Sequence, residues 1–173
     1  MQTKTMTGST QRLVLTAFMI AIAFVLNRIV PATPVYHLSM DFLAIFIVGY
    51  KFGPLWAGLA YGIADTLGSI LIPFGPYNPG ITLSLVILGL IYGFVFYKRD
   101  LTGKKIIGYS VICAVLTFLV KLFITTAFLW PVYGADNTYW AYVLLRIPNC
   151  ISIAIANIVL IPVVYKLLAE KIK

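Results

Sequence analysis

The sequence predicts an all-α integral membrane protein of six transmembrane helices with both termini in the cytoplasm. The first observation is composition: the 173 residues are 61% hydrophobic and only 10% charged, whereas soluble domains are about 25% charged. The second is pattern, because the apolar residues form continuous runs near the ~20 residues that a spanning helix needs, without the alternation of a membrane β-barrel. The third is the distribution of lysine and arginine, described below.

The six predicted spans form one membrane domain, residues 1–173, with no separate soluble part. They cover about residues 12–30, 38–49, 55–72, 81–97, 106–130 and 140–168. Proline and glycine separate several of them, as at Pro31 and in the turn 51–54, because neither residue continues a helix easily. The second span is short for a crossing helix. We expect the first apolar run to be a retained span, because no signal-peptide cleavage pattern follows it.

The basic residues lie on one side of this arrangement, which fixes the expected orientation. The N-terminus, the 50–54 turn, the 98–105 hairpin and the C-terminus hold ten of the thirteen: Lys4, Arg12, Lys51, Lys98, Arg99, Lys104, Lys105, Lys166, Lys171 and Lys173. The loops 31–37, 73–80 and 131–139 contain none. Because cytoplasmic loops are enriched in lysine and arginine, these three loops are expected outside. The net charge of +8 is therefore a topology signal, and we expect no nucleic acid partner.

The stretch Ile72 to Ser84, IPFGPYNPGITLS, lies between two apolar runs and resists helix formation. It carries three prolines and two glycines and no charge. Its position predicts an ordered loop at the outer mouth of a membrane-buried binding pocket. We expect the part from Tyr77 to Ser84 to act as a lid over the ligand.

Five charged residues fall within or at the edge of the spans: Arg28, Asp41, Asp65, Lys121 and Arg146. Charge in hydrocarbon is costly, so such residues usually face a cavity or a partner. At about 1.5 Å per residue, all five lie in the outer half or near the middle of the membrane. An internal salt bridge such as Asp65 with Lys121 is the structural alternative. Because bases outnumber acids, the set predicts a pocket that opens outward and holds an anionic ligand.

Aromatic residues gather on the same outer face: Tyr36, His37, Phe74, Tyr77, Trp130, Tyr133, Tyr139 and Trp140. An interfacial belt is the alternative explanation, above all for Trp130 and Trp140. His37 has no companion ligands for a metal and is interpreted as a loop residue. Cys113 and Cys150 lie in apolar segments and are interpreted as packing residues. We therefore expect no metal and no cofactor.

The sequence contains no Walker motif, nucleophile elbow, HExxH or pair of catalytic carboxylates. The protein is not expected to be an enzyme, and any energy for uphill transport must come from a partner. Ala17 and Ala21 share one face of the first span, a spacing that permits close helix contact. Gly58 with Gly62, and Gly89 with Gly93, repeat this spacing.

The run from Leu38 to Ser84 resembles the substrate-binding S-components of energy-coupling factor (ECF) vitamin transporters, most closely those specific for folate. The likeness is carried by the Phe52-Gly53-Pro54 turn, by Ala64-Asp65 at the end of a glycine- and alanine-rich span, and by YNPGITLS from Tyr77 to Ser84. The segment Arg146-Ile-Pro-Asn149 matches more loosely. Asn78 stands where the family pattern has an aromatic residue.

The resemblance implies a six-helix protein of the cell membrane that binds a vitamin from outside. It also implies a transmembrane coupling subunit, contacted by Ala17 and Ala21, and two ATP-binding-cassette ATPases. A pterin ring suits aromatic stacking and a carboxylate such as Asp65, and an anionic glutamate tail suits cations. The candidate substrate-binding residues are Arg28, Asp65, Tyr77, Asn78, Pro79, Gly80, Thr82, Ser84, Lys121, Arg146 and Asn149.

Three alternatives stay open from sequence. The ligand of an S-component can be another vitamin, such as pantothenate, riboflavin or a pterin-like compound. An intramembrane enzyme acting on a lipid head group is a second alternative, although the acid cluster it would need is missing. A stand-alone channel or secondary transporter is the third, and charges confined to the outer half argue against it.

Overall fold

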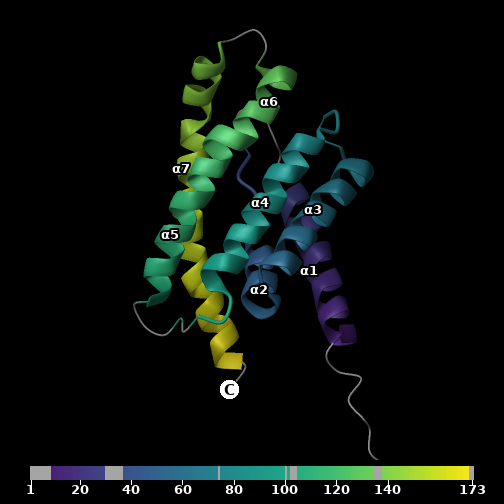
Figure 1. Ribbon diagram of the computed structural model, residues 1–173, viewed down its shortest axis with the longest axis vertical. Coiled ribbons are helices and arrows are strands. Elements are labelled where there is room, and N and C mark those ends of the chain that lie inside the picture. Colours follow the sequence, from purple (N-terminus) through teal and green to yellow (C-terminus); the bar gives the residue numbers. More distant parts are fainter. Residues whose placement is uncertain are drawn as a thin grey trace, which may run out of the picture.

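The computed structural model describes residues 9–29, 37–73, 75–99, 101, 105–134 and 138–171, and all the regular structure in these ranges is helical (Figure 1). The helices are α1 (Ser9–Ile29), α2 (Phe42–Phe52), α3 (Pro54–Leu71), α4 (Pro79–Phe96), α5 (Lys105–Leu119), the π-helical η1 (Val120–Thr125), α6 (Thr126–Tyr133) and α7 (Tyr139–Lys171). Because α5, η1 and α6 follow one another without a break, each predicted span has one helical segment.

Within the described ranges, four segments are long and apolar enough to cross a membrane: residues 10–29, 79–96, 105–133 and 139–167. The 11-residue α2 is apolar but shorter. α3 has 18 residues and carries Asp65. These helices make the protein an all-α, multi-span membrane protein, as the composition predicts.

The second helix is displaced from its expected position. Helix α2 begins at Phe42, and Leu38 to Met40 have no regular secondary structure. The Asp41 carbonyl oxygen accepts hydrogen bonds from the backbone N–H groups of Ala44 and Ile45. The first turn of α2 therefore follows Asp41. The helix then runs through the expected turn to Phe52 and ends at Gly53, whose φ of 96° favours glycine.

The proline-rich stretch is shorter than expected, because α4 begins at Pro79 and residues 79–84 are helical. Asn78 caps this helix: its Oδ1 accepts a hydrogen bond from the Gly80 N–H at 2.9 Å. Proline fits the first helical position because its missing N–H would have no partner there. The C-terminal end of α6 also extends past its predicted limit, with Pro131 inside the helix and Tyr133 as its last residue.

The helices pack in two groups on either side of α4 (Figure 1). α1, α2 and α3 lie on one side, and α5 and α7 on the other. Glycines allow α3 and α4 to approach closely: a Cβ added at Gly89 would lie 2.5 Å from the Ala57 carbonyl oxygen and 2.8 Å from Gly58 Cα. The buried core around this contact includes Ile45, Phe46, Ala57, Ala60, Leu88, Tyr92 and Phe96.

The start of α1 and the C-terminal end of the chain lie at one end of the molecule, and α6 lies at the other (Figure 1). The turn between α3 and α4 lies at the same end as α6. The two ends of the bundle are therefore distinct, and the polar residues described next belong to the α6 end.

Candidate functional site

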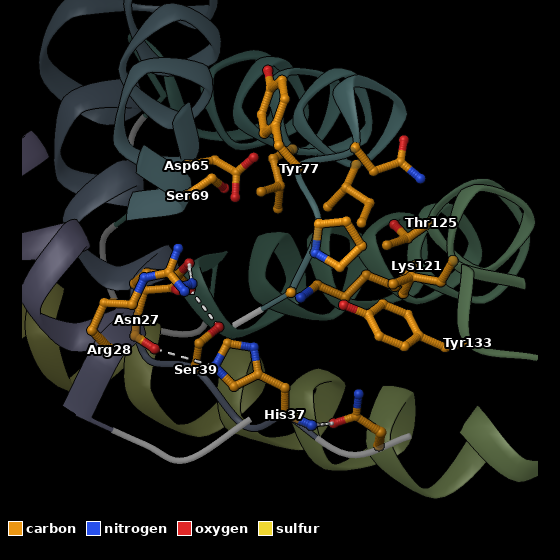
Figure 2. Close-up of a pocket in the computed structure, with 18 of the residues that line it drawn as sticks. Asn27, Arg28, His37, Ser39, Asp65, Ser69, Tyr77, Lys121, Thr125 and Tyr133 are labelled. Atoms are coloured by element: carbon orange, nitrogen blue, oxygen red, sulfur yellow. Dashed lines mark hydrogen bonds between the residues drawn. The ribbon is translucent and has the colours of Figure 1, made fainter. Parts of the chain in front are cut away.

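A cavity of about 200 Å³ opens between the helices at the α6 end, and side chains from both helix groups surround it (Figure 2). Its lining residues are Asn27, Arg28, His37, Ser39, Asp41, Asp65, Ser69, Gly75, Pro76, Tyr77, Asn78, Ile81, Leu85, Lys121, Thr125, Leu129, Tyr133, Arg146 and Asn149. Most of them are polar or charged, which is unusual for the interior of a membrane protein.

Asp41 is the most deeply buried acid of the cavity, with 2% of its surface exposed. Its Oδ2 accepts a hydrogen bond from Asn27 Nδ2 at 2.7 Å, and its Oδ1 accepts one from Ser39 Oγ at 2.8 Å. These two bonds offset part of the cost of burying the carboxylate. They also tie α1 to the start of α2, so Asp41 supports the cavity wall.

His37 joins the segment before α2 to two helices. Its backbone N–H donates to Asn149 Oδ1 of α7 at 3.3 Å, and its Nε2 lies 3.2 Å from the Asn27 carbonyl oxygen of α1. Because a carbonyl only accepts, Nε2 carries the proton. Burial lowers the pKa of His37, and the Lys121 cation acts in the same direction, so both favour the neutral imidazole.

Asp65 and Ser69 lie four residues apart on α3 and face the cavity together (Figure 2). Thr82 Oγ1 of α4 donates to Asp65 Oδ2 at 2.7 Å and lies 3.2 Å from the Tyr77 hydroxyl oxygen. Thr82 is therefore a donor to this carboxylate, which has about four lone-pair sites and retains acceptor capacity towards the cavity.

Arg28 reaches the cavity from α1 across the surface of α3. A Cβ added at Gly68 would lie 2.5 Å from Arg28 Nη2 and 3.0 Å from Nε. The missing side chain of Gly68 thus makes the space that the guanidinium occupies.

Two further cations approach from the other group of helices. Lys121 lies with Thr125 and Tyr133 on the side of the view opposite Asp65 and Ser69 (Figure 2). Arg146 of α7 is 6% exposed, and its Nη1 donates to Thr126 Oγ1 at 3.0 Å. The buried Nε of Arg146 has no hydrogen-bond partner among the described residues.

This arrangement suits a ligand with two chemically different ends. Carboxylates on one side can accept hydrogen bonds from a donor-bearing edge, and Arg146 and Lys121 on the other side can bind a carboxylate or phosphate. The few apolar linings, such as Ile81, Leu85 and Leu129, can contact the flat faces of a ring. A small organic anion is the ligand class that these groups fit.

Seven of the eleven residues proposed from the sequence line this cavity: Arg28, Asp65, Tyr77, Asn78, Lys121, Arg146 and Asn149. Pro79 and Gly80 do not; they form the first turn of α4, where Gly80 packs against the Phe128 ring. Thr82 and Ser84 do not line the cavity either. Thr82 Oγ1 donates to Asp65, and Ser84 is fully buried, with its Oγ donating to the Ile81 carbonyl and accepting from Thr125 Oγ1.

Asn78, the departure from the family pattern, has a clear structural role. Its Nδ2 donates to the Phe128 carbonyl oxygen of α6 at 2.7 Å while its Oδ1 caps α4. The side chain therefore fastens the α3–α4 turn to α6, beside the cavity.

Several lining residues were missed from the sequence, among them Asn27, Ser39, Ser69 and Thr125, whereas Asp41 was expected near the pocket but was not among the proposed ligand contacts. Ser69 and Thr125 follow Asp65 and Lys121 by four residues, a helical spacing that places each beside a predicted residue. Ser39 and Asn27 carry no such pattern, because their role depends on which helices meet.

The expected aromatic cluster is only partly at the cavity. Tyr77 and Tyr133 line it, whereas Tyr139 packs edge-on against Trp130 and Trp140. Tyr36 and Phe74 lie outside the described residues. Ala17 and Ala21 are exposed on α1.

The family comparison agrees with this fold and cavity. Residues 11–165 match the family described as "ECF transporter, substrate-specific component". The chain belongs to this family, and it is a multi-pass protein of the cell membrane.

Individual relatives are similar over most of their length. The chain is 34% identical over 119 residues to the folate transporter FolT of Clostridium novyi, covering 68% of this chain and 67% of the relative. It is 32% identical over 137 residues to the FolT of Streptococcus mutans, covering 77% and 73%. A crystal structure of FolT bound with folic acid superposes with a TM-score of 0.78 at 26% identity, covering 89% of this chain and 91% of that one.

Proposed function

We propose that this protein is the folate-binding subunit of an ECF transporter, capturing folate from outside the cell in the cavity at the α6 end. The observation that carries the proposal is the two-sided cavity, with Asp65 and Ser69 facing Lys121 and Thr125 (Figure 2). Similarity to folate transporters, one of them solved with folic acid, supports folate as the ligand.

The chemistry assigns the two ends of folate to different walls. The pterin edge carries donors that the Asp65 carboxylate can accept, and the glutamate tail is an anion that fits Arg146 and Lys121. Arg28 also lines the cavity, close to Asp41 and Asp65, and is the third cation that can interact with the ligand. Tyr77, Asn78 and Asn149 lie around the mouth and wall as further polar contacts.

The proposed function also implies an orientation in the membrane and a set of partner subunits. Six spans with both termini in the cytoplasm would place the α6 end of the bundle outside the cell. This orientation agrees with the basic residues expected at the opposite, cytoplasmic end. The exposed Ala17 and Ala21 of α1 would contact the transmembrane coupling subunit. ATP hydrolysis would belong to two ATP-binding-cassette ATPases, and this subunit would have no catalytic activity.

Mass spectrometry of the small molecule that copurifies with the protein tests the proposed function. We expect folate in the wild-type protein and in Ile70→Trp, because Ile70 is 71% exposed on the lipid side of α3. The adjacent Ser69→Trp should lose it, because Ser69 faces the cavity. A different vitamin would overturn the folate assignment, and folate retained in Ser69→Trp would overturn the choice of cavity.

A further inference from the structure

The π-helical turn η1 lets several residues of one helix face the cavity together. In an unbroken α-helix the same residues would point in different directions. Lys121, Thr125, Leu129 and Tyr133 all line the cavity at four-residue intervals. In an α-helix each four-residue step overshoots a full turn by about 40°, so three steps amount to about 120°. A π-helical turn contains one more residue than an α-helical turn. This extra residue removes roughly 100° of that rotation. Lys121 and Tyr133 therefore face the same side (Figure 2).

Two threonine hydroxyls bond to the carbonyls of this turn, each five residues back in the chain. Thr126 Oγ1 donates to the Lys121 carbonyl oxygen at 3.0 Å. Thr125 Oγ1 lies 3.5 Å from the Val120 carbonyl oxygen and also donates to Ser84 Oγ of α4 at 3.1 Å. In a widened turn the regular helical hydrogen bonds leave some carbonyl oxygens poorly paired. The Thr126 hydroxyl, which makes the shorter bond to such a carbonyl, therefore stabilises the turn that presents Lys121.

The Thr126 hydroxyl has a second partner, because it accepts the hydrogen bond from Arg146 Nη1 at 3.0 Å. One hydroxyl thus joins the backbone of Lys121 on η1 to the guanidinium of Arg146 on α7. Thr126 is fully buried and does not line the cavity. Any effect of Thr126 on a ligand must therefore act through these two cations.

We infer that Thr126 is a positioning residue that sets selectivity for ligands with an anionic tail, an inference that rests on the proposed function. Without the hydroxyl, Arg146 loses the acceptor that fixes its orientation and the Lys121 carbonyl loses its donor. The two cations then no longer converge on one anion. The part of the ligand bound at the opposite wall is unaffected.

The test compares purified Thr126→Val with wild type by calorimetric titration, using folate and pteroate, which lacks the glutamate. We expect Thr126→Val to weaken folate binding by about tenfold or more and to change pteroate binding less than about twofold. Thr126→Ser should restore folate affinity, because it keeps the hydroxyl. Thr117→Val is the matched control: Thr117 is 1% exposed on α5, and among the described residues its hydroxyl bonds to the Ala114 carbonyl of its own helix and to no other group. It should bind both compounds as wild type does.

Several results would overturn the inference. Equal losses for folate and pteroate would mean that Thr126 supports the fold and has no special effect on the tail. Unchanged folate affinity in Thr126→Val, with wild-type protein binding folate, would remove the inference but leave the proposed function intact. Wild-type protein that fails to bind folate would remove both. If Thr126→Val does not fold, Thr126→Ala removes the same hydroxyl with less bulk, and the same expectations apply.

Discussion

The buried charged residues Arg146 and Asp41 differ in how completely their hydrogen-bonding groups are paired. Asp41 receives hydrogen bonds from Asn27 and Ser39 on its two carboxylate oxygens. Arg146 donates from Nη1 to Thr126, while its buried Nε has no partner among the described residues. A satisfied acid is a structural support, whereas a buried guanidinium with donors to spare is suited to an anionic ligand.

Replacing Arg146 should therefore affect binding more than folding. We predict that Arg146→Ala weakens folate binding by about 10- to 100-fold, the value of charge-assisted hydrogen bonds at 1.5–3 kcal/mol. Titration calorimetry on the purified variant measures this. Arg28→Ala should also weaken binding, because Arg28 lines the same cavity.

Arg99→Ala is the control for Arg146→Ala, because Arg99 is an exposed arginine in the turn after α4. It should bind folate as wild type does. Wild-type affinity in both cavity variants would contradict an anion site built from these arginines.

At the scale of residues, the sequence predicts the charged residues of the site better than the small polar residues around them. Arg28, Asp65, Lys121 and Arg146 stand out because each is expensive in an apolar span. Asn27 and Ser39 do not stand out, since small polar residues are common in such helices and only the meeting of α1 with α2 gives them their role. Ser84 does not line the cavity, because its Oγ bonds to the Ile81 carbonyl and to Thr125 Oγ1; in sequence, such a hydroxyl looks identical to one that faces a cavity.

The contact between α3 and α4 is the closest helix packing around the core, and it depends on small residues. A Cβ at Gly89 would meet the Ala57 carbonyl oxygen at 2.5 Å, and Gly93 packs directly against Pro54. The backbones can approach this closely only because no side chain separates them. The contact fixes the position of Asp65 on α3 relative to the N-terminal end of α4.

Gly89→Ala should destabilise the protein. We predict that the free energy of unfolding falls by about 1–3 kcal/mol, because the added methyl group must displace the backbone of α3. Thermal unfolding in detergent provides the measurement. Gly108→Ala is the matched control, since a Cβ there has no neighbour within 4 Å; it should leave stability unchanged or raise it by about 0.5–1 kcal/mol. A melting temperature for Gly89→Ala equal to wild type would contradict this packing.

At the scale of elements, the sequence predicts the existence and order of the helices, since long apolar runs separated by glycine and proline are strong signals. It predicts their ends less well. Pro79 was taken as a breaker but serves as the first residue of α4 behind the Asn78 cap. The η1 turn has no hydrophobic period of its own, so only the structure reveals that it re-aims Lys121.

For the whole molecule, the cavity lies at one end and the exposed face of α1 extends towards the other (Figure 1). Large apolar side chains of α1, such as Val14 at 64% and Phe18 at 60%, are exposed beside Ala17 and Ala21. Binding and docking should therefore be separable functions of different surfaces.

We predict that Ala17→Trp and Ala21→Trp bind folate normally in purified form but abolish folate uptake by cells. A bulky ring on this face would keep a partner helix from close approach without reaching the cavity. Ile155→Trp, on an exposed position of α7, is the control and should support uptake. Normal uptake by both alanine variants would exclude this face as the docking surface.

The most direct test of the central claim is the vitamin selectivity of the purified protein prepared from folate-depleted cells. Calorimetric titration with folate, riboflavin and pantothenate would compare one anionic pterin with two vitamins of other shape and charge. We predict saturable one-to-one binding of folate, with a dissociation constant at least about 100-fold lower than for the other two. No saturable folate binding, or tighter binding of riboflavin or pantothenate, would contradict the account.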